Sequence, residues 1–148
     1  MTVIAGSDHA GLELKRIVLD HLRQQGVEVR DLGCDTPEST DYPRYAREVG
    51  EAVALSPGDL GLLVCGTGIG MSIAANKVLG VRAALCENEL SARLAREHND
   101  ANVLCLGGRI TGPNLACAIA DAFLDATFEG GRHERRVQMI RDMDSKRR

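Results

Sequence analysis

Short apolar runs alternate with longer amphipathic segments along the whole chain. Five runs are predicted as strands because they are brief, rich in aliphatic residues and bounded by polar or glycine residues. They span 2–6, 27–32, 60–65, 81–85 and 103–106. Apolar residues at helical spacing predict the helices between them, and a glycine pair precedes a last, charged helix. The helices span 12–25, 45–55, 71–77, 89–98, 113–128 and 133–145, and a loop is predicted over 33–43.

This alternation predicts an α/β fold. The expected architecture is a three-layer α/β/α sandwich around a five-stranded, mainly parallel, Rossmann-like sheet. The length of 148 residues fits a single domain over residues 1–148. Ligands of such sheets bind beyond the carboxyl ends of the strands. One rim of the sheet is therefore expected to carry the segments 7–9, 65–70, 86–88 and 107–109.

Composition narrows the class of protein. The formal net charge is −3, and the chain has two Phe, two Tyr and no Trp. Both features argue against nucleic-acid binding. No apolar run is long enough to span a bilayer, so no membrane partner is expected. The five cysteines are scattered without a Cys-x-x-Cys pair, and the N-terminus lacks the pattern of a secretory signal. A reducing, cytoplasmic setting is therefore expected.

The most distinctive segment follows the third predicted strand and contains three glycines. Its sequence is Cys65-Gly66-Thr67-Gly68-Ile69-Gly70. It lacks the lysine of a P-loop, and its Gly-x-Gly-x-Gly spacing differs from the fingerprint of dinucleotide-binding turns. N–H groups at the following helix start favour negative charge and stabilise a thiolate, the reactive form of cysteine. This segment, the glycine loop (residues 65–70), thus offers a candidate base beside a candidate anion site. A tight turn without chemistry is the alternative on local grounds.

Polar residues elsewhere suggest further chemistry, although each also has a purely structural explanation. Asp8 and His9 follow the first strand, where the carboxylate equally suits a helix cap. His98 ends a charged helix, and a helix C-terminus favours the protonated imidazole, which suits a proton donor. A polar turn explains that position equally well. The histidines show no metal-ligand spacing, so no metal site is expected; they are His9, His21, His98 and His133.

Three arginines are candidates for binding a phosphate group. Arg132 and Arg136 share one face of the last predicted helix, and Arg109 follows the fifth strand. Together they could clamp a phosphate dianion, although such residues taken alone more often form a solvated basic face. A thiol, a carboxylate, two histidines, three arginines and an anion-binding loop fit one small, anionic substrate that exchanges protons.

These residues resemble the sugar-phosphate isomerase family that includes ribose-5-phosphate isomerase B and the galactose-6-phosphate isomerase subunits. The similarity covers nearly the whole chain in several separated, ordered motifs. They are Gly6-Ser7-Asp8-His9-Ala10-Gly11, Thr40-Asp41-Tyr42-Pro43, the run from Cys65 to Lys77, the run from Arg93 to Asn102, Gly107-Gly108-Arg109 and Glu129-Gly130-Gly131-Arg132-His133.

The resemblance implies an aldose–ketose isomerase of ribose 5-phosphate and ribulose 5-phosphate, in the non-oxidative pentose phosphate pathway, without metal or organic cofactor. It implies that Cys65 moves the proton between C2 and C1 through a cis-enediolate. Thr67 would hydrogen-bond near that proton, and His98 would assist ring opening with Asp8 as a polar partner. The resemblance also implies substrate contacts from Asp8, His9, Gly66, Thr67, Gly68, Ile69, Gly70, Asn99, Arg109, Arg132 and Arg136.

Family members are homodimers or tetramers whose sites draw on both chains, so the last helix is expected to reach a neighbouring subunit. Two other functions stay open at this point. One is isomerisation of a six-carbon sugar phosphate, such as allose or galactose 6-phosphate. The other is a non-catalytic, flavodoxin-like sensor or signalling domain. A response regulator would need an acidic cluster near the first strand and a lysine after the fifth, where this chain has only Asp8 and Gly107-Gly108-Arg109.

Overall fold

A five-stranded parallel sheet forms the centre of the protein. The computed structural model describes residues 1–146, so the last two residues of the predicted 1–148 domain lie outside the described residues. The strand order is β2-β1-β3-β5-β4, and every neighbouring pair is parallel. The strands are β1 (Thr2–Ser7), β2 (Glu28–Asp31), β3 (Leu60–Cys65), β4 (Ala83–Leu85) and β5 (Val103–Gly107).

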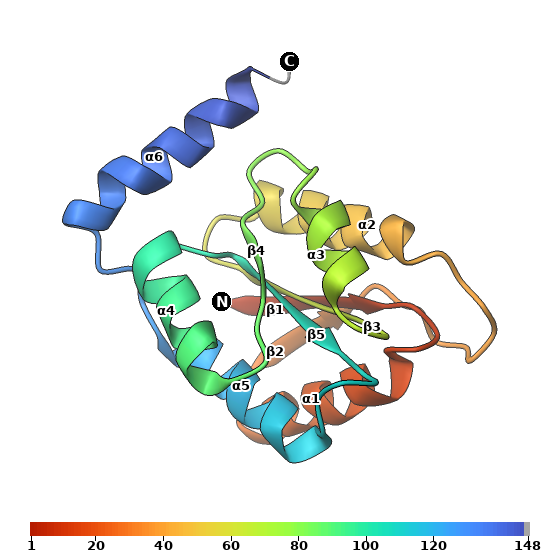
Figure 1. Cartoon of the computed structure of the whole chain (residues 1–148). Helices are drawn as coiled ribbons and strands as arrows, with labels where there is room; N and C mark the ends of the chain where they lie inside the picture. Colours follow the sequence, from red (N-terminus) through yellow and green to blue (C-terminus); the bar gives the residue numbers. More distant parts are fainter. Residues whose placement is uncertain (147–148) are drawn as a thin grey trace.

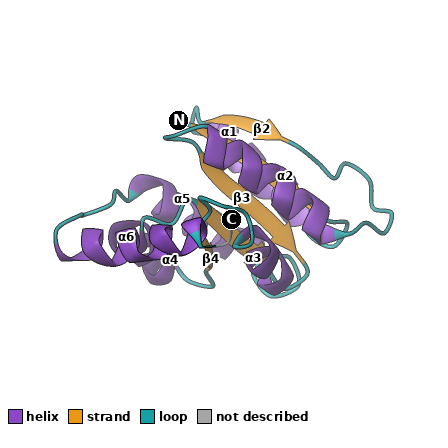
Figure 2. Cartoon of the chain, turned by 90° about the horizontal axis from the view of Figure 1, so that it is seen from above, coloured by secondary structure: helices purple, strands orange, loops and turns teal. Residues whose placement is uncertain are grey.

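Helices cover both faces of this sheet, which confirms the predicted α/β/α sandwich (Figures 1 and 2). One face packs against α1, α4 and α5, and the other against α2 and α3. The sixth helix, α6, contacts mainly α4 and lies outermost (Figure 1). The helices are α1 (Leu12–Gln24), α2 (Tyr42–Leu55), α3 (Ile69–Ala75), α4 (Glu89–Asn99), α5 (Pro113–Asp125) and α6 (Arg132–Ser145).

Alternate residues of the inner strands enter two separate hydrophobic cores. Leu62 and Val64 of β3 point toward α1 and α5, whereas Leu63 and Cys65 point toward α2 and α3. Both faces of the sheet are covered, so β3 is buried at every position. This explains why the inner strands read as continuous apolar runs rather than as alternating patterns.

Several helix boundaries differ from the predicted ones. The predicted loop over 33–43 ends early, because α2 begins at Tyr42 with a proline in its first turn, where a missing N–H costs nothing. The helix after the glycine loop begins at Ile69 rather than 71, since Gly68 adopts a left-handed conformation and starts the turn. The fifth helix ends at Asp125 rather than 128, because the chain becomes extended at Ala126.

The connections place the candidate functional residues at the two opposite ends of the parallel strands. We call these the carboxyl edge and the amino edge of the sheet. Ser7 pairs with Val64 and Cys65 with Gly107, so the carboxyl ends of β1, β3 and β5 lie side by side, as predicted. Each helix returns the chain to the other edge, so α4 ends at Asn99, close to the amino ends of the strands. The backbone carbonyl of Asn102, just past α4, accepts a hydrogen bond from the N–H of Gly61 near the start of β3.

Candidate active site

The thiol of Cys65 lies at the carboxyl end of β3 and is 4% exposed. Its Sγ accepts a hydrogen bond of 3.2 Å from the backbone N–H of Gly68. This turn requires glycine, because Gly68 has a φ of 77° and a Cβ there would lie 2.5 Å from the side chain of Leu85. The loop therefore wraps around the sulfur and donates a hydrogen bond to it.

The rest of the glycine loop has both engaged and available donors. The N–H of Ile69 donates to the hydroxyl of Thr67 over 3.2 Å, which leaves the hydroxyl hydrogen free to donate elsewhere. The N–H groups of Gly68 and Ile69 are thus already used within the loop, although the sequence placed both in the anion site. Arg109 lies against the loop: a Cβ on Gly66 would be 3.1 Å from its guanidinium.

Asp8 and His9 lie on the same edge, after β1. The carboxylate of Asp8 accepts the N–H of Gly11 over 3.0 Å, so it fastens the turn before α1; the N-cap of α1 is Gly11, so Asp8 is not the helix cap that the sequence suggested. His9 and Thr40 exchange two hydrogen bonds: the N–H of His9 donates to the Thr40 hydroxyl, and the N–H of Thr40 donates to Nδ1 of His9. The neutral ring therefore carries its hydrogen on Nε2, where it can donate to a phosphate.

A buried lysine holds the segment that carries Thr40. Lys15 has no exposed surface, and its Nζ donates to Asp31 Oδ1 over 2.8 Å and to the carbonyl of Cys34 over 2.7 Å. A buried ammonium needs such partners, since an unpaired charge in the interior is costly. Lys15 thus anchors the start of the 33–41 loop, whose far end positions His9.

A second group of candidates lies at the other edge, where α4 ends and α6 begins. The rings of His98 and His133 are stacked, with centroids 4.2 Å apart and an interplanar angle of 11°. Glu129 Oε2 lies 3.9 Å from Nε2 of His98 and 3.7 Å from Nε2 of His133. Burial lowers the pKa of the His133 imidazole, and the neighbouring His98 and Arg132 lower it further.

The remaining residues of this second group are exposed. Arg132 and Arg136 lie four residues apart on α6 and have no carboxylate partner within residues 1–146. Asn99 is the last residue of α4. Next to it, Asp100 accepts hydrogen bonds from Arg82, Arg96 and Arg141. These contacts fix the end of α4 and tie α6 to it.

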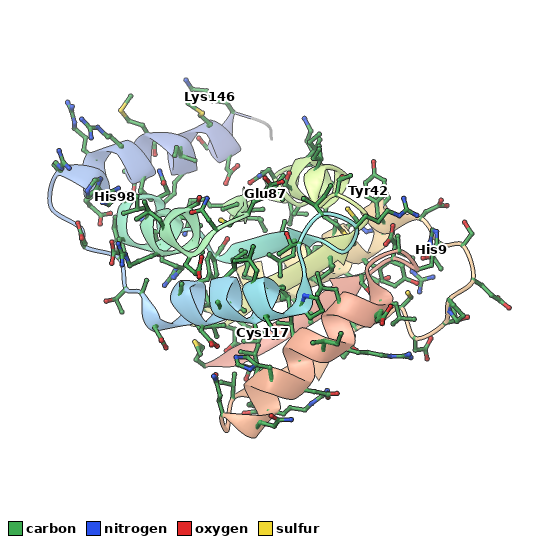
Figure 3. The ribbon with its side chains drawn as sticks, turned by 60° about the horizontal axis from the view of Figure 1, so that its bottom comes forward. His9, Tyr42, Glu87, His98, Cys117 and Lys146 are labelled. Atoms are coloured by element: carbon green, nitrogen blue, oxygen red, sulfur yellow. The ribbon has the colours of Figure 1, made fainter. Side chains whose placement is uncertain are left out.

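The structure therefore separates the predicted site residues into two groups. The carboxyl-edge group comprises Asp8, His9, the glycine loop (residues 65–70) and Arg109, and the amino-edge group comprises His98, Asn99, Arg132 and Arg136. The six residues of β3 lie between the two edges, a length of roughly 15–20 Å. His9 and His98 accordingly lie on opposite sides of the molecule (Figure 3). One chain cannot bring both groups onto one small substrate.

The other cysteines differ from Cys65 in their surroundings. Burial raises the pKa of Cys86 to about 11, and it raises the pKa of the fully buried Cys105 well above its usual range. In Cys117, burial and the nearby Asp121 raise the pKa as well. None of the five cysteines forms a disulfide. Cys65 is the thiol whose sulfur accepts a backbone N–H from a helix start.

Some side chains that contact the predicted site residues were not among the predictions. Thr40 and Tyr42 were visible only as part of a motif, yet Thr40 bonds His9 and Tyr42 packs against Gly70, where a Cβ would be 2.6 Å from its ring. Glu129 and His133 join His98 although the spacing of the histidines had suggested no metal cluster. Only the folding of the 126–131 segment brings them together.

Comparison with known proteins identifies the family of this chain. A family model described as Ribose/Galactose Isomerase matches residues 3–140, and the chain belongs to this family. It is 51% identical to ribose-5-phosphate isomerase B of Escherichia coli, over 96% of this chain and 95% of the relative.

Two solved structures are close in fold as well as in sequence. Ribose-5-phosphate isomerase B of Clostridium thermocellum superimposes with a TM-score of 0.97 at 50% identity, over 100% of both chains. That of Mycoplasma genitalium, which contains bound ribulose 5-phosphate, gives a TM-score of 0.94 at 46% identity, over 98% of this chain and 97% of its own. Within residues 1–146, no helix is both long and apolar enough to cross a bilayer.

Proposed function

We propose that this protein interconverts D-ribose 5-phosphate and D-ribulose 5-phosphate. The observation that carries the proposal is the Cys65 sulfur, held at a strand end with the Gly68 N–H 3.2 Å away. A thiolate in that position can act as the base that removes a proton from carbon. Membership of the ribose/galactose isomerase family, and a relative with bound ribulose 5-phosphate, support the choice of substrate.

The proposed reaction moves one proton between two carbons. The Cys65 thiolate takes the proton from C2 of the open-chain aldose. The electron pair of that bond forms the C1–C2 double bond, and the carbonyl oxygen on C1 becomes the oxyanion of a cis-enediolate. The thiol then returns its proton to C1 while C2 becomes the carbonyl, and the C2 hydroxyl proton passes to the C1 oxygen. The free hydroxyl hydrogen of Thr67 and the available N–H groups of the loop stabilise the oxyanion.

The charged residues serve binding and ring opening. Arg109, Arg132 and Arg136, with Nε2 of His9, bind the phosphate dianion. His98, at the C-terminus of α4, donates a proton to the ring oxygen as the furanose opens. Asn99 holds a sugar hydroxyl, and Asp8 acts as the polar partner of ring opening.

These roles require two chains, so we infer a homodimer with shared sites. In a two-fold dimer, the carboxyl-edge group of one chain meets the amino-edge group of the other, and two complete sites result. Exposed apolar side chains beside both groups support this arrangement. Ile69 and Ile73 are 52% and 59% exposed beside the glycine loop, and Met139 and Met143 are 57% and 56% exposed on α6. Apolar surface of this kind commonly marks an interface.

Two further inferences concern the whole chain. The two cores lie on opposite faces of one sheet, which supports a single domain over the described residues. Five free cysteines suit a reducing compartment, so we place the enzyme in the cytoplasm.

Substrate preference tests the proposal. Turnover of ribose 5-phosphate and of allose 6-phosphate is compared by kcat/KM, with chelator present so that free metal ions do not interfere. A higher kcat/KM for ribose 5-phosphate is expected. Preference for the six-carbon sugar would reassign the substrate, and turnover of neither would contradict the isomerase function itself.

A further inference from the structure

Three potential metal ligands meet where α4 ends and α6 begins. One nitrogen each from His98 and His133 and one carboxylate oxygen from Glu129 all lie within 4.8 Å of one another. They come from three different places: the last turn of α4, the connecting segment and the first turn of α6. We propose that these residues form a Zn²⁺ site whose occupation inhibits the enzyme.

The donor set fits zinc. Two imidazoles and one carboxylate, with a fourth position left to water, is an arrangement found in zinc sites, and zinc is borderline between hard and soft ligands. Zinc–ligand bonds of about 2.0–2.2 Å in a tetrahedron place neighbouring ligand atoms about 3.3 Å apart. The present separations from Glu129 to His98 and His133 are 3.9 and 3.7 Å. The carboxylate oxygen must therefore move by about half an ångström, and the two ring nitrogens, which lie within 4.8 Å of each other, must approach by up to about 1.5 Å.

Two of the ligands can make that adjustment. The side chains of Glu129 and His98 are 54% and 34% exposed, whereas His133 is 9% exposed and held in place. The stacked rings must tilt apart so that both Nε2 lone pairs point at the ion. Glu129 folds back over His133 because Gly130 and Gly131 have φ values of 64° and 55°, which other residues rarely adopt. The N–H of Glu129 is also fixed to the carbonyl of Glu97 over 3.0 Å.

Nearby positive charge lowers the affinity of this site for Zn²⁺. Arg132 flanks His133 and, with Arg136, raises the potential felt by its ring. Two arginines against one carboxylate oppose a divalent cation. We therefore expect reversible binding, weaker than that of structural zinc sites, which suits an inhibitory rather than a structural ion.

The inhibitory effect rests on the proposed function. His98 needs a free Nε2 to carry the ring-opening proton, and a bound metal occupies that lone pair. Zinc and catalysis therefore compete for one nitrogen. Glu129 and His133 have no part in the proposed reaction, so they offer substitutions that separate metal binding from turnover.

Binding is measured first, by calorimetric titration of Zn²⁺ alone in a buffer that does not chelate it. A Cys65→Ala background removes the thiolate as a competing ligand. Glu129→Gln and His133→Asn should each weaken binding more than about tenfold. His21→Asn is the matched control, because His21 pairs with Asp121 on α5 instead. Equal affinity in the parent and both variants would overturn the site.

Inhibition is measured next, with Cys65 intact. Glu129→Gln and His133→Asn should isomerise without zinc and lose at least about tenfold in sensitivity to it. Melting curves identify loss of fold in His133→Asn, and the exposed Glu129→Gln keeps the test decisive if that variant unfolds. Undiminished inhibition of Glu129→Gln would overturn the regulatory role. Absence of turnover in the chelated wild type would instead refute the proposed function, while the titration still decides whether the site exists.

Discussion

Arg141 donates a hydrogen bond of 3.0 Å from Nη2 to Oδ2 of Asp100, and this contact joins α6 to the end of α4. The same carboxylate accepts from Arg82 over 2.9 Å and from Arg96 over 3.2 Å. Asp100 thus accepts hydrogen bonds from three guanidinium groups, and its backbone has a φ of 47° at the helix end. The position of α6, and with it that of Arg132 and Arg136, depends on this cluster.

Removing Arg141 should loosen α6 without unfolding the protein. Arg141 is 39% exposed, so Arg141→Ala should cost only about 0.5–1 kcal/mol in the free energy of unfolding. KM should rise more than kcat falls, because the phosphate-binding arginines lose their support. Steady-state kinetics and urea unfolding measure both effects.

Asp100→Asn is the stronger change. It should lower the free energy of unfolding by at least about 2 kcal/mol, since three arginines lose the carboxylate that they share. Equal stability of Asp100→Asn and Arg141→Ala would contradict this.

Replacing Cys65 tests the proposed base. Cys65→Ala should lower kcat by about 10²–10⁴-fold while the fold and substrate binding persist. Cys117→Ala is the matched control, because Cys117 is a partly buried thiol on α5 outside both groups. Single-turnover assays and binding of an unreactive analogue separate the two effects. Near-wild-type kcat in Cys65→Ala would assign proton transfer to another residue.

His98 is expected to act in ring opening rather than in proton transfer between carbons. Ribose 5-phosphate must open its furanose ring, whereas ribulose 5-phosphate cannot close one. His98→Asn should therefore impair the aldose direction more than the ketose direction when fresh substrate is followed before equilibration. Equal losses in both directions, after allowance for the equilibrium constant, would count against this role.

Hybrid dimers test the shared site. Mixing inactive Cys65→Ala chains with inactive Arg136→Ala chains should restore about a quarter of wild-type activity, because half of the dimers are hybrids with one intact site each. Cys65→Ala mixed with Arg109→Ala is the matched control: both changes fall in the carboxyl-edge group, so no intact site can form. Recovery in the control, or none in the first mixture although hybrids are verified by mass spectrometry, would refute the division into two groups.

Alkaline pH should destabilise the fold through Cys86. Burial raises its pKa to about 11 from an ordinary 9.0, so between these values the unfolded chain loses a proton that the folded chain keeps. The free energy of unfolding should therefore fall as pH rises from about 9 toward 11. Urea unfolding of wild type and Cys86→Ala across this range isolates the effect. A slope equally steep in both would show that other groups cause it.

Local pattern was sufficient to predict every strand and helix, because the strands are short apolar runs and the helices between them carry apolar residues at helical spacing. It misplaced some ends, at Tyr42, Ile69 and Asp125, where a proline, a left-handed glycine or an extended residue decides the boundary. The carboxyl-edge group was also predictable. Parallel strands bring their ends to one rim, so residues that follow separate strands in sequence become neighbours in space.

The sequence by itself determined the α/β class, the glycine loop with its thiol, and the family motifs, since these depend on residue type and short spacing. Only the tertiary structure decided that His98 lies a strand's length from Cys65, because the direction of α4 follows from the crossover and not from any local pattern. It also decided that Glu129 and His133 meet His98, and that Thr40 orients His9. Such contacts join distant segments and form only when the sheet and its helices pack.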